Sequence, residues 1–205
     1  MRKKSEVLER EFVLGSASER RQQILDMIGL KYTVVTSDID EDCDETDPSE
    51  YAKQISYMKA KAVAKKVKGN AVVVTADTVI YKNGEEFGKP KDRAEAIKMI
   101  KALSNGVSVA TTGVTIFDMY TNHIESYTDN AYVTFKRMTD EEIEWYVDNE
   151  KSVYDCAGYA LLGKASIFLE KVNGDYNTVF GISPSFLFEK LKDFGYTFEN
   201  FTFEK

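Results

Sequence analysis

The residue that first suggests chemistry is Asp77, a carboxylate inside the apolar, mostly β-branched run Ala71–Ile80. Such a run predicts a strand that is buried on both faces. Because an unpaired buried charge is costly, Asp77 needs a cation, a hydrogen-bond donor or a ligand as its partner. The alternative is a structural aspartate that closes a strand, which is the usual outcome for a lone Asp. Lys89, twelve residues later and followed by Pro90, could bring a fixed cation to the same end of the sheet.

A second charged group lies where a short predicted strand, Phe12–Gly15, leads into a helix. The connection reads Ser16-Ala17-Ser18-Glu19-Arg20-Arg21, with Ser18 as the candidate N-cap. Free backbone N–H groups and the helix dipole attract an anion to such a terminus. Arg20 and Arg21 oppose that dipole unless a bound anion compensates their charge. The alternative is that they form a solvated first turn.

Two further segments contribute charged side chains. The stretch Asp38–Glu45 is acidic at every position except Ile39 and Cys43, and a solvated loop is a sufficient explanation for it. It lacks the spacing of an EF-hand. Lys59 lies beside the apolar seam of the helix predicted from Pro48 to about residue 68. A lysine in that position can extend to solvent, whereas one that points inward would need an anion.

The elements that must position these residues alternate along the chain. Four capped helix starts are predicted at Asp47, Asp92, Thr139 and Ser183. Hairpin turns are predicted at Asn83-Gly84 and at Thr121-Asn122-His123, with long strands over 107–120 and 124–136 around the second turn and a later strand over 167–169. Interleaved helices, strands and an antiparallel pair predict an α/β or α+β fold with a mixed sheet.

Composition narrows the class of protein. The 205 residues suffice for one domain, expected over 11–205 after a polar N-terminal extension over 1–10. A net charge of −7 argues against a nonspecific nucleic-acid binder. The two cysteines lack metal or redox spacing and fit a reducing compartment, and no apolar segment predicts a signal peptide or a spanning helix. We expect a cytoplasmic protein without nucleic-acid or membrane partners.

Several catalytic patterns are absent. The sequence has neither a P-loop nor a dinucleotide-binding G-x-G-x-x-G motif. His123 is the only histidine and lies in a polar turn, which argues against a centre of the Ser-His-Asp or Cys-His type. Without thiolates and imidazoles at ligand spacing, zinc is not expected either.

Taken together, the charged segments resemble the Maf family of nucleoside triphosphate pyrophosphatases, related in fold to the inosine triphosphate pyrophosphatases. The motifs that carry the resemblance span about residues 12–195: Ser16–Arg21, Asp38–Glu41, Lys59-Ala60, Ala76-Asp77-Thr78, Gly88-Lys89-Pro90, Thr112-Gly113-Val114 and Gly174–Pro184. The resemblance implies an elongated mixed sheet flanked by helices, with two lobes and a central cleft. It also implies hydrolysis of NTPs or dNTPs to NMP and pyrophosphate, as house-cleaning of the nucleotide pool.

The same resemblance assigns roles to residues. Glu41 and Asp77 match the family's metal and base carboxylates, with Mg²⁺ or Mn²⁺ as the expected cofactor. Lys59 and Lys89 match its phosphate-binding lysines. The loop that grips the triphosphate is matched by Ser16, Arg20 and Arg21. The branch that prefers dTTP and UTP combines an arginine, a threonine after the aspartate and a glutamine, and the first two are matched by Arg20 and Thr78.

The chain departs from the family pattern at three places. Glu19 replaces a usual proline, and Ser108 replaces a usual histidine. In the stretch Ala157–Gly163 the glutamine is lost, with Leu162 in its place, so the base preference is left open. Two alternatives therefore stay open. One is a nucleotide-binding regulator of cell division or septum formation with little turnover. The other is a domain whose charged residues lie at loop ends and have no function in triphosphate binding. By analogy alone, the fold is compatible with a homodimer.

Overall fold

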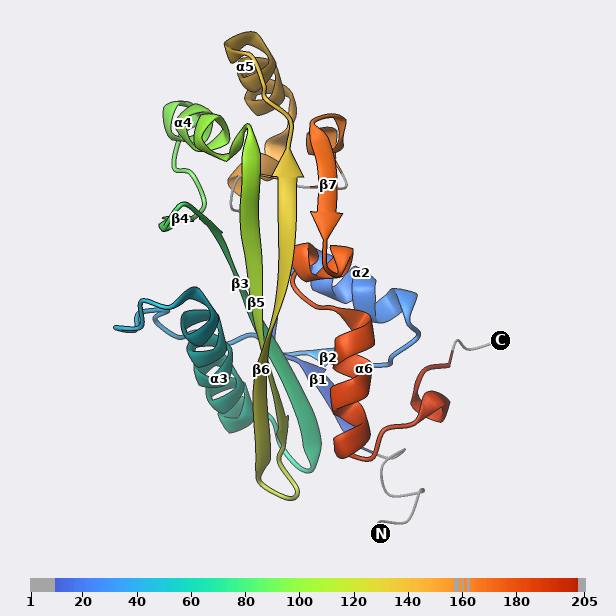
Figure 1. Cartoon of the computed structure of the whole chain (residues 1–205). Helices are drawn as coiled ribbons and strands as arrows, with labels where there is room; N and C mark the ends of the chain where they lie inside the picture. The colour runs from blue at the N-terminus through green and yellow to red at the C-terminus, as the bar shows by residue number, and fades with distance from the viewer. Residues whose placement is uncertain (1–9, 157–158, 160, 162, 203–205) are drawn as a thin grey trace. The chain divides into compact units, whose positions relative to one another are not determined.

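The strands of this computed structural model form one seven-stranded mixed sheet, in the order β2-β1-β3-β5-β6-β7 with β4 paired to β3 (Figure 1). The structure describes residues 10–156, 159, 161 and 163–202. The strands are β1 (Glu11–Leu14), β2 (Thr33–Val34), β3 (Ala71–Lys82), β4 (Glu85–Phe87), β5 (Gly106–Asp118), β6 (His123–Phe135) and β7 (Leu169–Asn173). β1 pairs in parallel with β2 and β3, whereas the pairs β3–β4 and β6–β7 are antiparallel. The predicted mixed sheet is therefore confirmed.

Helices flank this sheet, and their starts follow the caps expected from the sequence. They are α2 (Glu19–Met27), α3 (Pro48–Lys66), α4 (Arg93–Leu103), α5 (Asp140–Asn149) and α6 (Pro184–Asp193), with short 3₁₀ segments η1 (Lys151–Tyr154), η2 (Lys164–Ile167), η3 (Tyr176–Phe180) and η4 (Phe198–Asn200). The Asp47 carboxylate accepts hydrogen bonds from the first turn of α3, and Thr139 forms a reciprocal capping box with Glu142. Each interaction satisfies backbone N–H groups that have no partner within the helix.

The chain divides into two compact units, in agreement with the two lobes expected from the family resemblance. Of the described residues, the first unit comprises those within 10–78, 112–129 and 180–202, and the second comprises those within 79–111 and 130–179. Strands β3, β5 and β6 each contribute residues to both units.

The core of the first unit lies on both faces of β3. Val72, Val74 and Ala76 belong to an apolar cluster shared with α6, whereas Ala71 and Val73 belong to a second cluster shared with α3. Alternate residues of a strand point to opposite faces, so this division is what a strand buried on both sides requires. The predicted burial of the Ala71–Ile80 run is confirmed, and Asp77 within it is only 9% exposed.

At the N-terminus and at β7 the structure differs from the sequence expectation or lies partly outside it. Residues 1–9 of the predicted N-terminal extension lie outside the described residues, whereas Arg10 donates a hydrogen bond to the buried Asp118 carboxylate at 3.0 Å. The strand expected over 167–169 begins only at Leu169, because Ile167 closes the 3₁₀ segment η2. In the described part of the chain, no helix has the length and apolarity needed to cross a membrane.

The second unit contains a buried lysine that serves a helix end. The Lys82 ammonium donates to the carbonyl oxygens of Leu103, Ser104 and Asn105, at 3.0, 2.9 and 3.2 Å. These carbonyls belong to the last residue of α4 and the two residues after it, where backbone acceptors lack helical partners and a cation is favourable. Lys82 therefore supports the fold of the second unit by capping α4.

Candidate functional site

The centre of the candidate site is a buried contact between α3 and β3 in the first unit. Lys59 Nζ lies 2.7 Å from Asp77 Oδ1 and 2.9 Å from Glu41 Oε1. Lys59 and Asp77 are each 9% exposed, whereas the side chain of Glu41 is about half exposed. The sequence left open whether Lys59 extends to solvent or points inward. The structure shows that it points inward, and its anionic partners are the two carboxylates.

A network of buried hydroxyl groups holds α3 at this position on the sheet. The Thr75 hydroxyl donates to the Ser56 carbonyl at 2.6 Å, and the hydroxyls of Ser56 and Thr115 lie 2.8 Å apart. All three side chains are fully buried. Thr75 precedes Asp77 by two residues and Ser56 precedes Lys59 by three, so the network fixes the helix on the strand close to the ion pair.

Gly113 sets how closely α3 approaches β5. A Cβ at this position would lie 2.2 Å from the carbonyl carbon of Ala52 in the first turns of α3. Only glycine permits such an approach of two backbones. The T-G-V motif found in the sequence therefore has a packing role, because it lets the helix that carries Lys59 lie directly on the sheet.

A second cluster in the same unit surrounds the Arg21 guanidinium. It donates to Ser16 Oγ at 3.0 Å, to Thr78 Oγ1 at 3.1 Å and to the Gly181 carbonyl at 3.3 Å. The Thr78 hydroxyl also lies 2.9 Å from that of Thr112. All three acceptors of Arg21 are neutral oxygens, so they orient the guanidinium without neutralising its charge.

The charged groups of the two clusters act on one another. Burial lowers the pKa of Arg21 from its ordinary value, Asp77 acts in the opposite direction, Arg20 lowers it further and Glu41 raises it. Because arginine stays protonated over the whole physiological range, this shift leaves its charge unchanged. The mutual influence places the Lys59 and Arg21 clusters in a single electrostatic environment that can attract an anion and hold a cation.

The start of α2 adds backbone donors beside Arg21. Ser18 is the N-cap residue, as predicted, but its side chain makes no capping hydrogen bond. Instead, the Ser18 N–H donates to Ser16 Oγ at 3.2 Å. The first turn of α2 is therefore not closed by its own N-cap side chain, and such a terminus can receive a phosphate oxygen.

The structure brings together most of the residues that the sequence singled out. The first unit holds Ser16, Arg20, Arg21, Glu41, Lys59, Asp77 and Thr78. Lys89 is an exposed residue of the second unit, between β4 and α4, and its role in phosphate binding stays a prediction. Sequence reasoning assigned no role to Ser56, Thr75 or Thr115. For Thr75 and Thr115, a hydroxyl residue within an otherwise apolar buried strand is the signal that could have indicated them, and for Ser56 it is a hydroxyl residue on the apolar face of α3.

The stretch expected near the nucleobase is described only in part. Ala157, Gly158, Ala160 and Leu162 lie outside the described residues. The Tyr159 hydroxyl lies 3.0 Å from Ser108 Oγ, and the Tyr176 hydroxyl donates to the Leu161 carbonyl at 3.2 Å. Ser108, which stands in place of the family's usual histidine, is thus used to hold Tyr159.

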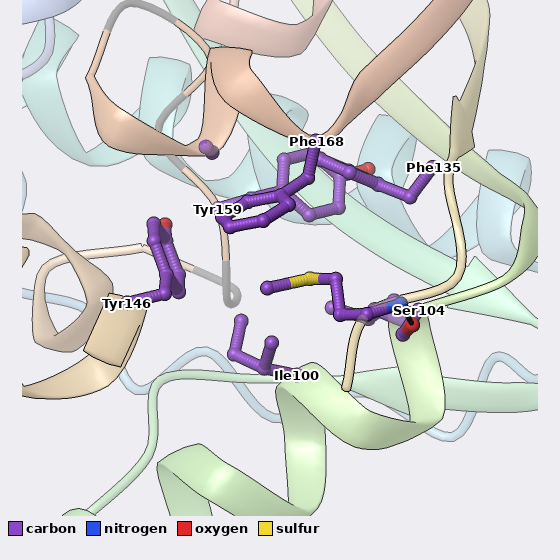
Figure 2. A pocket seen from close by; sticks show the side chains of 9 residues that line it. Ile100, Ser104, Phe135, Tyr146, Tyr159 and Phe168 are labelled. Atoms are coloured by element: carbon purple, nitrogen blue, oxygen red, sulfur yellow. Dashed lines mark hydrogen bonds between the residues drawn. The ribbon is translucent and has the colours of Figure 1, made fainter. Parts of the chain in front are cut away.

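An apolar cavity in the second unit lies beside this stretch. Figure 2 shows Ile100, Phe135, Tyr146, Tyr159 and Phe168 turned toward it. The free space is about 10 Å³. Mostly apolar side chains line it, so this cavity belongs to the packed interior of the second unit.

The oxygen donors present suit a hard divalent cation. One oxygen of Glu41 and one of Asp77 both contact Lys59 Nζ, so the two carboxylates lie close together. Carboxylate oxygens are the ligands that Mg²⁺ and Mn²⁺ prefer. Among the described residues, no group of three or more His, Cys, Asp or Glu side chains could enclose a metal.

Known proteins resemble this chain over most of its length. The family described as Maf-like protein matches residues 11–194. A protein named dTTP/UTP pyrophosphatase from Thermoanaerobacter sp. (strain X514) is 40% identical over 181 residues, which cover 88% of this chain and 94% of that protein. A protein of the same name from Clostridium novyi (strain NT) is 35% identical, with 89% and 97% covered. A solved structure of a HAM1 protein from Coxiella burnetii aligns over 89% of this chain and 90% of that chain, at 15% identity and a TM-score of 0.43.

Proposed function

The chain belongs to the family of Maf-like proteins, and we propose that it is a nucleoside triphosphate pyrophosphatase. The observation that carries the proposal is the Lys59 ammonium between the Asp77 and Glu41 carboxylates, beside the Arg21 guanidinium. Hydrolysis of a triphosphate needs this combination of a carboxylate that positions water and cations that stabilise phosphate charge. The relatives with 35–40% identity bear the names of enzymes, which favours turnover over a regulator that only binds nucleotide.

In the proposed reaction a water oxygen adds to phosphorus and the α,β-phosphoanhydride bond breaks. Asp77 accepts the proton from the attacking water, and strand β3 holds this carboxylate beside Lys59. Arg21 and the amide groups that begin α2 bind phosphate oxygens and stabilise the charge that develops on the leaving pyrophosphate. Glu41 and Asp77 would hold Mg²⁺ or Mn²⁺, which would neutralise part of the negative charge on the phosphate oxygens.

The proposed substrates are dTTP and UTP. Two relatives are named for these nucleotides, and Thr78 and Arg20 match the corresponding branch of the family. Modified pyrimidine nucleotides belong to the same proposal, because Leu162 replaces the glutamine of that branch. Lys89 is proposed to bind phosphate on the family pattern, and Lys89→Ala should weaken nucleotide binding.

The test is pyrophosphate release from a panel of natural and modified NTPs and dNTPs, with Mg²⁺ and Mn²⁺ compared. We expect release from dTTP and UTP, and a loss of at least about a hundredfold in Asp77→Asn, which cannot accept the proton. Asp193→Asn, an exposed change of the same kind in the first unit, serves as the control. Release from no member of the panel, or full activity of Asp77→Asn, would contradict the proposal. Nucleotide binding without hydrolysis would favour the regulator instead.

A further inference from the structure

Lys59 lies between the two carboxylates that would hold a metal, and its effect on metal binding rests on the proposed pyrophosphatase function. We infer that Lys59 keeps the affinity of Glu41 and Asp77 for a free divalent cation low, so that the metal enters as its complex with the nucleotide. The lysine thereby selects the metal-nucleotide complex over the free ion.

The geometry places the ammonium where a metal would compete with it. Lys59 Nζ lies within 2.9 Å of one oxygen of each carboxylate, so both are already engaged by a cation. Lys59 and Asp77 are nearly buried and come from regular elements, whereas Glu41 lies on a segment without regular structure and is about half exposed. A metal that takes both carboxylates must share them with the ammonium or displace it.

Charge makes either outcome less favourable than metal binding to two carboxylates without the ammonium. Two carboxylates and one ammonium leave a net charge of −1 at the site, and a divalent cation a few ångströms from an ammonium is repelled. In the described chain the carboxylate pair is not part of any larger group of potential metal ligands. A triphosphate changes this balance, because its oxygens complete the coordination of the metal and give Lys59 another anion to contact.

Replacement of Lys59 by methionine separates this role from a structural one. Lys59→Met keeps the aliphatic stem and removes the ammonium, so the carboxylate pair faces the metal alone. We expect the Kd of the nucleotide-free protein for Mn²⁺ to fall by about tenfold or more. Pyrophosphate release should fall at the same time, because the lysine contact to phosphate is lost. A variant that had merely lost structure would not gain metal affinity.

The experiment is a calorimetric titration of the full chain with Mn²⁺ in the absence of nucleotide. Lys65→Met, an exposed change of equal charge on the same helix, is the matched control and should bind Mn²⁺ as the wild type does. Lys59→Gln is the second variant in case methionine disturbs folding. A double variant that combines Lys59→Met with Glu41→Gln should lose the Mn²⁺ affinity that Lys59→Met gains. Wild-type protein with a non-hydrolysable dTTP analogue should bind Mn²⁺ at least about tenfold more tightly than without it.

The inference is overturned if Lys59→Met and Lys59→Gln bind Mn²⁺ no more tightly than the wild type. It is also overturned if the wild type binds the free ion as tightly as it does with the analogue. Because the titration needs no turnover, its result is independent of the proposed activity. A protein that releases no pyrophosphate, yet gains Mn²⁺ affinity on loss of Lys59, would contradict the proposed function alone.

Discussion

The backbone at Gly181 lies so close to Arg21 that a Cβ at position 181 would come within 2.6 Å of the guanidinium Nε. The same Nε donates to the Gly181 carbonyl at 3.3 Å, and Gly181 has a φ of +105°. The residue is therefore glycine for two reasons, its backbone conformation and the approach of a side chain. This contact helps to aim Arg21 at Ser16 and Thr78.

Gly181→Ala should lower pyrophosphate release by about tenfold to a hundredfold, because the new methyl group displaces Arg21 from its orientation. The measurement is kcat/KM for dTTP together with the midpoint of urea denaturation. Gly69→Ala is a matched control, since Gly69 also has a positive φ of +89° but nothing lies within 4 Å of its Cβ position. Both variants should lose about 1 kcal/mol of stability from backbone strain. Equal activity of the two variants would contradict a role of the Gly181 contact in orienting Arg21.

Thr75→Val should reduce both stability and activity. Valine keeps the shape of the side chain but cannot donate to the Ser56 carbonyl, at a cost of about 1–2 kcal/mol. Since Ser56 lies one helical turn before Lys59, loosening this contact should also shift the ammonium relative to Asp77. Urea denaturation and the pyrophosphate assay measure the two effects. Thr75→Ser retains the hydroxyl and should restore activity; unchanged activity of Thr75→Val would restrict the network to a role in folding.

Lys82→Met should destabilise the protein without a direct effect on phosphate chemistry. The change removes the ammonium from three carbonyl oxygens at the end of α4, at a cost of about 2 kcal/mol. Lys98→Met, on the exposed part of the same helix, is the control for the loss of charge. Chemical denaturation measures the difference. Equal stability of the two variants would show that Lys82 does not cap α4.

Glu150 should make the second unit sensitive to acid. Burial acts to raise the pKa of Glu150, but hydrogen bonds from Lys164 N–H and from the hydroxyl and N–H of Ser152 outweigh it and hold the pKa below its ordinary value. A carboxylate whose pKa is lowered in the folded protein contributes stability at pH values above its unfolded pKa of about 4.3. That stabilisation is lost as the pH falls through the pKa of the folded state.

Glu150→Gln should therefore be less stable than the wild type at pH 7, and the difference should shrink as the pH falls below about 4. Denaturation curves at several pH values test this, with hydrogen exchange at the Lys164 amide as a local readout. Glu141→Gln, an exposed change on α5, is the control. A stability difference that does not depend on pH would show that the charge of Glu150 contributes nothing.

Much of the local structure could be predicted from the sequence, because its signals are short in range. The cap of α3 at Asp47, the turn at Asn83-Gly84 and the capping box at Thr139 are each set by residues within four positions of one another, and all are confirmed. The sequence predicts the start of β7 two residues too early, since an apolar triplet fits a 3₁₀ turn as well as a strand. The family membership predicted from the motifs is also confirmed.

The sequence by itself determined which chemical groups are available: carboxylates, lysines and arginines at the ends of elements, in the order typical of the family. Only the tertiary structure decided their partners. Lys59 meets Asp77 because buried hydroxyls and Gly113 set the height of α3 on the sheet. Arg21 meets Gly181 across 160 residues of chain. Contacts between residues so far apart in the sequence depend on strand pairing and helix packing, which no local pattern encodes. These contacts pair the two carboxylates with Lys59 and orient the Arg21 guanidinium.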